Sequence, residues 1–165
     1  MSVTINEIDF LHAVDNVVKN LNGISNLYDS QLEVLRSLVM DTSNLFVTAP
    51  TSSGKTLPPV LLPSLLHELS DIGYDVPSFS RVLFVTAMNS IQLSLLTSMN
   101  NLGISCAALT KDNVDEVLES KVKVLLIGPE VLKMKNVTKS LLKVRSSFSL
   151  KVIDEAHLGM YYVYH

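Results

Sequence analysis

The sequence predicts an α/β fold, with a mostly parallel sheet and helices on both faces. Short apolar runs rich in β-branched residues alternate along the chain with segments whose apolar residues recur at helical spacing. The apolar runs are continuous, which is typical of strands that are covered on both faces. A phosphate-loop pattern follows the first run and an acidic pair follows the last. Strands that alternate with helices form βαβ units, so we expect the strands to be parallel.

Each strand is predicted from a short run of apolar residues. The runs are Leu45–Ala49, Arg81–Thr86, Ile104–Leu109, Lys123–Ile127 and Leu150–Asp154. The helical segments lie near residues 8–21, 32–39, 61–69, 91–99, 114–118 and 141–144. We expect residues 1–25 to form an N-terminal helical extension and residues 26–165 to form one partial domain.

Composition restricts the class of protein. The chain has 165 residues, 47% hydrophobic and 18% charged, which is enough apolar material for a core and argues against disorder. The net charge of −3 is a mild point against nucleic-acid binding over the whole surface, but it allows a local phosphate-binding strip. No apolar run approaches the ~20 residues that a membrane helix needs. Cys106, the single cysteine, is expected to be a small buried hydrophobe.

The segment from Ala49 to Thr56 has the pattern of a phosphate-binding loop. It reads Ala-Pro-Thr-Ser-Ser-Gly-Lys-Thr, follows an expected strand and precedes an expected helix that starts near Lys55. Small residues let several backbone N–H groups point at one phosphate, and the helix N-terminus adds its positive end. The candidate nucleotide-binding residues of this loop are Thr51, Ser52, Ser53, Gly54, Lys55 and Thr56. The alternative is a polar turn that happens to contain Gly-Lys-Thr.

Lys55 and Thr56 have distinct expected roles. Lys55 places a cation against the β- and γ-phosphates, and the hydroxyl of Thr56 is offered to Mg²⁺. A second group of candidates ends the last expected strand, where Asp154 and Glu155 are adjacent. Carboxylates at strand ends face the ligand crevice of open α/β sheets, so Asp154 is expected to hold Mg²⁺ and Glu155 to orient the attacking water. The alternative is an acidic pair that stabilises a helix N-terminus.

The two motifs together resemble those of superfamily 2 helicases. Asp154-Glu155-Ala156-His157 spells the DEAH form of motif II, and Ala49 to Thr56 looks like motif I. The resemblance implies a RecA-like P-loop fold that uses ATP and Mg²⁺, and it implies that His157 links the ATP state to the rest of the motor. Gln31 is similar to the glutamine of motif 0, which reads adenine through its side-chain amide. Without the resemblance, Gln31 would be taken as an ordinary surface residue.

Two softer motifs point to nucleic acid. Val82 to Gln92 resembles motif Ia, and Leu125 to Leu132 resembles motif Ib with the Pro-Glu pair of RecQ-like DNA helicases. The resemblance implies that these segments contact the nucleic-acid backbone, DNA more than RNA, in a nuclear protein. The implied contact residues are Ala87, Asn89, Ser90, Gly128, Pro129 and Glu130. Asn89 or Ser90 can also act as a plain helix cap.

The sequence departs from the RecQ-like pattern after motif II. Leu158 to His165 does not match the aromatic-rich loop of that group, and motif III and the second motor lobe are expected beyond His165. We therefore expect an incomplete sheet, and a chain that by itself is marginally folded, binds ATP weakly and has little or no activity. The parent protein is expected to be an ATP-dependent DNA helicase that couples hydrolysis to unwinding or translocation.

Other functions stay open at this point. One is an RNA helicase of the same superfamily, another is a P-loop ATPase that remodels a different target, and a third is a non-catalytic nucleotide- or nucleic-acid-binding module. A basic group follows motif Ib, and a solvated face is about as good an interpretation of it as a DNA-backbone contact. Its members are Lys133, Lys135, Lys139, Lys143 and Arg145.

Overall fold

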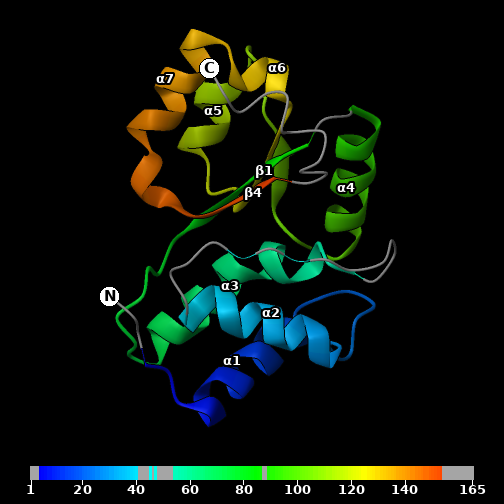
Figure 1. Cartoon of the computed structure of the whole chain (residues 1–165), viewed down its shortest axis with the longest axis vertical. Helices are drawn as coiled ribbons and strands as arrows, with labels where there is room; N and C mark the ends of the chain where they lie inside the picture. Colours follow the sequence, from blue (N-terminus) through cyan, green and yellow to red (C-terminus); the bar gives the residue numbers. More distant parts are fainter. Residues whose placement is uncertain (1–3, 41–44, 46, 48–53, 87–88, 154–165) are drawn as a thin grey trace. The chain divides into compact units, whose positions relative to one another are not determined.

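The computed structural model describes residues 4–40, 45, 47, 54–86 and 89–153 (Figure 1). The chain divides into two compact units, residues 1–80 and 81–165. The first unit contains helices and the second contains the sheet. The division of the chain into an extension at residues 1–25 and a domain at 26–165 stays a prediction.

The first unit is built from three helices: α1 (Glu7–Lys19), α2 (Asp29–Met40) and α3 (Leu57–Asp71). Helix α1 begins after Asn6, whose Oδ1 accepts a hydrogen bond from the backbone N–H of Ile8 at 2.8 Å, as an N-cap residue should. Both α1 and α2 pack against α3. Pro58 and Pro59 lie in the first turn of α3, where missing N–H groups are tolerated.

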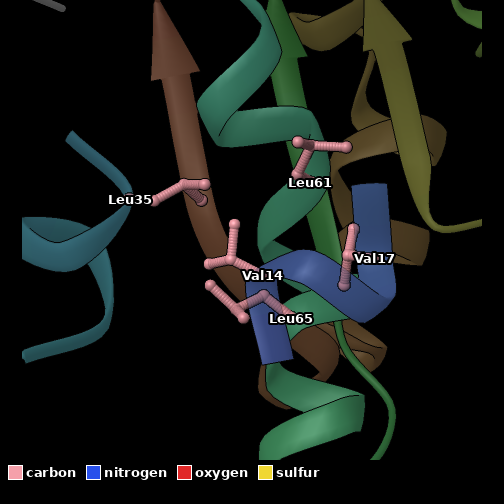
Figure 2. A pocket seen from close by; sticks show the side chains of 5 residues that line it. All are labelled: Val14, Val17, Leu35, Leu61 and Leu65. Atoms are coloured by element: carbon pink, nitrogen blue, oxygen red, sulfur yellow. The ribbon is translucent and has the colours of Figure 1, made fainter. Parts of the chain in front are cut away.

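Apolar side chains of all three helices meet in the core of this unit (Figure 2). Val14 and Val17 come from α1, Leu35 comes from α2, and Leu61 and Leu65 come from α3. The space among these side chains is too small to hold a water molecule. This junction is therefore packed core, and it offers no room for a ligand.

The second unit contains a sheet of four strands in the described residues: β1 (Arg81–Val85), β2 (Cys106–Ala108), β3 (Val124–Ile127) and β4 (Phe148–Ile153). Their order is β2-β3-β1-β4 and every pair is parallel. The helices of this unit are α4 (Asn89–Asn101), α5 (Val114–Glu119), α6 (Pro129–Leu132) and α7 (Lys135–Lys143), and a 3₁₀ turn (Arg145–Ser147) precedes β4.

Helices cover both faces of this sheet. Leu83, Leu125 and Ile127 share one face and pack in a cluster with residues of α5 and α7, such as Leu118 and Val137. Helix α4 lies on the other side of the sheet (Figure 1). The predicted α/β class is confirmed, and the four parallel strands flanked by helices are consistent with an incomplete RecA-like P-loop fold.

Some predicted elements are wrong. Leu45 and Val47 are not in a strand and are 45% and 40% exposed, and they pair with none of the described strands; the rest of the predicted strand 45–49 lies outside the described residues. The expectation that every strand is covered on both faces fails for β4, whose exposure alternates along the strand. The alternation follows its sequence, since Ser149 and Lys151 stand between apolar residues.

Candidate nucleotide and nucleic-acid sites

Gln31 is tied to the phosphate loop. Its side-chain Nε2 donates to the carbonyl oxygen of Gly54 at 3.1 Å, and its Oε1 accepts from the backbone N–H of Tyr28 at 3.0 Å. The residue lies on the first turn of α2 and is only 5% exposed. The interpretation of Gln31 as an ordinary surface residue is therefore wrong. An amide has two N–H donors and two acceptor lone pairs, so one N–H and one lone pair remain for a ligand.

Gly54 has a backbone conformation that suits glycine. Its φ is +71°, in the left-handed region that residues with a Cβ enter at a cost. A Cβ built at this position would also collide with Nε2 of Gln31. The carbonyl oxygen of Gly54 additionally accepts from the backbone N–H of Leu57 at 3.0 Å. The glycine thus allows the amide of Gln31 to approach the backbone of the loop closely.

Lys55 and Thr56 form the turn that leads into α3. The helix begins at Leu57, two residues later than the expected start near Lys55. Thr56 occupies the N-cap position, yet its hydroxyl makes no capping hydrogen bond, so the hydroxyl can serve a ligand. Lys55 is exposed, and no carboxylate within the described ranges pairs with it. Lys55 therefore suits a phosphate, the hydroxyl of Thr56 suits Mg²⁺, and the spare groups of Gln31 suit a base. ATP-Mg²⁺ requires all three.

The carboxyl ends of three strands meet at one edge of the sheet in the second unit. Val85 of β1 is in register with Ile127 of β3 and Ile153 of β4. Thr86 and Gly128 follow the first two, and in the sequence Asp154 follows Ile153. Ligands of open parallel sheets bind at this edge. The structure therefore brings together the strand ends that carry the predicted motifs Ia, Ib and II.

Two polar residues at this edge were not predicted as site residues. Thr86 is 1% exposed, and its backbone N–H donates to the carbonyl oxygen of Ile127 at 3.0 Å. Within the described part of the chain, the hydroxyl of Thr86 and Nε2 of Gln92 are buried and have no hydrogen-bond partner. Such groups call for a partner, because leaving a buried polar group unpaired costs about 1–3 kcal/mol. Both residues lie in the motif Ia stretch, which was the available signal.

Gly128 connects the motif Ia and motif Ib segments. It is buried and precedes α6, whose first residue is Pro129. A Cβ at Gly128 would lie 3.3 Å from Nε2 of Gln92 and 3.3 Å from Oε2 of Glu130. Glu130 is exposed, and its carboxylate would repel a phosphate. Gly128 and Pro129 are buried, the side chains of Gln92 and Glu130 lie against Gly128, and Glu130 is therefore the predicted motif Ib contact that suits a phosphate least.

For the remaining predicted site residues, the structure gives a position in a helix or no description. Asn89 and Ser90 are in the first turn of α4. The other predicted residues fall outside the described residues; they are Thr51, Ser52, Ser53, Ala87, Asp154, Glu155 and His157. Among the residues that are described, no three His, Cys, Asp or Glu side chains gather as a metal site, and no helix is long and apolar enough to cross a membrane.

The parallel sheet, the Gly54-Lys55-Thr56 turn and the glutamine bound to it are consistent with an incomplete RecA-like P-loop fold. The profile of the DEAD/DEAH box helicase family matches residues 28–162, which is most of the chain. The chain therefore belongs to the DEAD/DEAH box helicase family, and the match supports the N-terminal lobe of a superfamily 2 helicase. No curated protein matches the chain.

Proposed function

We propose that this chain is the ATP-binding lobe of an ATP-dependent DNA helicase of the RecQ-like type, which couples ATP hydrolysis to unwinding or translocation. One observation carries the proposal: in a chain of the DEAD/DEAH box helicase family, the buried amide of Gln31 is hydrogen-bonded to Gly54 of the phosphate loop. A glutamine in that position joins base recognition to phosphate binding. The preference for DNA rests on the Pro129-Glu130 pair, which is similar to the RecQ-like motif Ib.

The nucleotide is held by charge and by backbone donors in this proposal. Lys55 neutralises the β- and γ-phosphates together with the N–H groups of Thr51, Ser52 and Ser53. Mg²⁺, bound through Thr56 and Asp154, would supply further neutralisation of the phosphate charge.

The water and the adenine have their own partners. Glu155 orients the attacking water, and Gln31 reads adenine with its remaining N–H and lone pair. His157 transmits the nucleotide state to the rest of the motor.

The nucleic acid is proposed to lie at the carboxyl edge of the second unit's sheet. The hydroxyl of Thr86 and the amide of Gln92 lie buried and unpartnered at this edge, and we propose that they pair with phosphate or sugar oxygens when the nucleic acid binds. Asn89 and Ser90, in the first turn of α4, are proposed to add backbone N–H groups, and Ala87 and Gly128 are proposed as further backbone contacts. From the resemblance to RecQ-like helicases, we propose a nuclear location.

A nucleotide titration tests the ATP site. Lys55→Ala is expected to weaken binding of a fluorescent ATP analogue about 10- to 100-fold, because it removes a charged hydrogen bond of about 1.5–3 kcal/mol. Lys19→Ala is the matched control, since Lys19 is also an exposed lysine of the first unit. Equal affinities for the two variants would remove the phosphate-loop assignment.

ATP hydrolysis by the parent protein, with and without polynucleotide, tests the motor. The proposal expects single-stranded DNA to stimulate hydrolysis more than RNA of the same length does, and expects Lys55→Ala to abolish the stimulation. Stronger stimulation by RNA would instead identify an RNA helicase of the same superfamily. Binding of ATP and DNA with no hydrolysis would identify a non-catalytic module, and hydrolysis that no polynucleotide changes would indicate an ATPase with another target.

A further inference from the structure

Helix α7 has a stripe of cations on its outer face. Lys135, Lys139 and Lys143 recur every four residues and are exposed; we call them the α7 lysine stripe. At about 100° per residue, they lie roughly 160–240° around the helix from Val137. Val137 is 0% exposed and Leu141 is 8% exposed, and both belong to the core cluster under the sheet. The helix therefore points its apolar side inward and its three lysines outward.

The sequence around this stripe contains no acidic residue, and the carboxylates nearest to it in the fold belong to α5, which packs against α7. From Val131 to Ile153 the sequence contains six cations and no carboxylate. Across the described stretches of the chain, no ion pair involves Lys135, Lys139 or Lys143. The nearest acidic contact of α7 is on its packed side, where the hydroxyl of Ser140 donates to Oδ1 of Asp115 at 2.6 Å. A row of unpaired cations in a family that binds nucleic acid is an electrostatic footprint for a polyanion.

The stripe is held rigidly next to the motif Ib segment. The hydroxyl of Thr138 donates to the carbonyl oxygen of Leu132 at 2.7 Å, which ties α7 to the end of α6. Helices α6 and α7 are in contact, and α6 begins with Pro129 of motif Ib (Figure 1). A preorganised row of cations loses little conformational freedom when it binds. A backbone that follows motif Ib can therefore continue over α7.

We propose that the α7 lysine stripe is a second, sequence-independent binding surface for the phosphate backbone of the nucleic acid on which the protein acts. This inference rests on the proposed function. The three lysines span about 12 Å at 1.5 Å per residue, a length over which duplex DNA carries several phosphates at one charge per about 1.7 Å. Lys133 and Arg145 extend the surface at its two ends.

The fold favours nucleic acid over a lipid surface. A basic amphipathic helix binds membranes by burying its apolar face among the lipids. In α7 that face is already buried against the sheet, through Val137 and Leu141. The outward side carries the three lysines and a single exposed apolar residue, Leu142 at 59%, which is too little apolar surface for insertion and leaves charge as the basis for binding a phosphate backbone.

Salt-dependent binding tests the stripe. Anisotropy titrations of the whole chain with labelled oligothymidylate, over a series of KCl concentrations, give the slope of log K against log [salt]. The variant Lys135→Gln/Lys139→Gln/Lys143→Gln is expected to bind all sequences more weakly and to reduce the slope by about 2, because each lost contact with a single-stranded phosphate removes about 0.7. Glutamine keeps a high helix propensity, and far-UV circular dichroism checks that the fold is unchanged.

The matched control removes the same charge elsewhere. Lys19→Gln/Lys111→Gln/Lys121→Gln alters three exposed lysines outside the stripe and is expected to leave the slope unchanged. An oligouridylate arm shows whether DNA or RNA supplies the phosphates, and the stripe is expected to contribute to both.

Three results would overturn the proposal in distinguishable ways. Unchanged affinity and slope in the stripe variant, with normal binding by the unaltered chain, removes the stripe and leaves the proposed function standing. Absence of polynucleotide binding by the unaltered chain removes both. A stripe variant that loses only its binding to phosphatidylserine vesicles would assign the surface to lipid.

Discussion

The contact between Gln31 and Gly54 makes a sharp prediction, because a single added methyl group should break it. Gly54→Ala introduces a Cβ at φ +71° and places it against Nε2 of Gln31. Gly23 provides a control in the same unit. Its φ is +75°, almost the same, and a Cβ there meets nothing within 4 Å. The two substitutions therefore share the backbone strain and differ in the steric contact.

The magnitudes can be estimated separately. A left-handed alanine costs about 1–2 kcal/mol relative to glycine, and the loss of freedom in the unfolded chain offsets about 0.4–1 kcal/mol of this. Gly23→Ala is therefore expected to lower the free energy of unfolding by about 1 kcal/mol. Gly54→Ala must in addition displace a buried amide from its hydrogen bond, which adds about 1–3 kcal/mol.

Urea unfolding followed by far-UV circular dichroism measures both changes, and the chain contains no tryptophan to use instead. On a Gln31→Ala background the amide is absent, so Gly54→Ala should then cost no more than Gly23→Ala does. This double-mutant cycle isolates the contact from the backbone term. Equal losses for Gly54→Ala and Gly23→Ala in the otherwise unaltered chain would refute the contact and, with it, the link between Gln31 and the phosphate loop.

Two further predictions concern the second unit. Arg81 is 5% exposed, and its guanidinium donates to the carbonyl oxygens of Leu118 and Ser120 at 3.0 and 2.6 Å and to Oγ of Ser147 at 3.0 Å. Arg81→Met should lower the free energy of unfolding by about 3–5 kcal/mol, and a loss below about 1 kcal/mol in a urea titration would contradict this role. Burial raises the pKa of the Cys106 thiol, so its thiolate fraction at neutral pH is smaller than that of free cysteine. Alkylation by iodoacetamide should therefore be slower than for N-acetylcysteine at neutral pH and accelerate as the pH rises; equal rates would be inconsistent with the half-buried position of this thiol.

The sequence predicted the second unit better than the first. Continuous apolar runs located β1 and β3, because strands covered on both faces need apolar residues at every position. The run Leu45–Ala49 has the same composition, yet Leu45 and Val47 are not in a strand. Strand formation depends on a partner as well as on composition, and a single run carries no information about its partner.

The helices after β3 show a different limit of prediction from sequence. Helix α6 was not predicted, because a single turn shows no periodicity and its residues had been interpreted as motif Ib. Helix α7 was predicted only at its C-terminal end. Its first half contains one apolar residue, Val137, among polar ones, so too little of the buried face was visible in the sequence.

The sequence predicted the kinds of site, but it did not predict which residues contact each other there. A resemblance to motif 0 singled out Gln31, yet nothing local indicated that it would be buried and bonded to a residue 23 positions away. Thr86 and Gln92 were missed as site residues for a related reason. Both are ordinary polar residues in the sequence, and they become notable only because the fold buries their polar atoms without partners among the described residues.

The net charge of −3 was the weakest guide to function, and the distribution of charge explains why. Residues 1–80 carry nine carboxylates and three cations, whereas residues 81–165 carry seven carboxylates and ten cations. Salt screens exposed charges beyond about 10 Å at 0.1 M, so a phosphate responds to the charges close to it and not to the sum over the chain. On α7 itself and along the chain around it the charge is positive, because Val131 to Ile153 contains six cations and no acidic residue, while the carboxylates of α5 lie on the packed side of α7, where Ser140 meets Asp115. A polyanion should therefore bind this acidic protein, and the binding should weaken steeply with salt, as a local cation row requires.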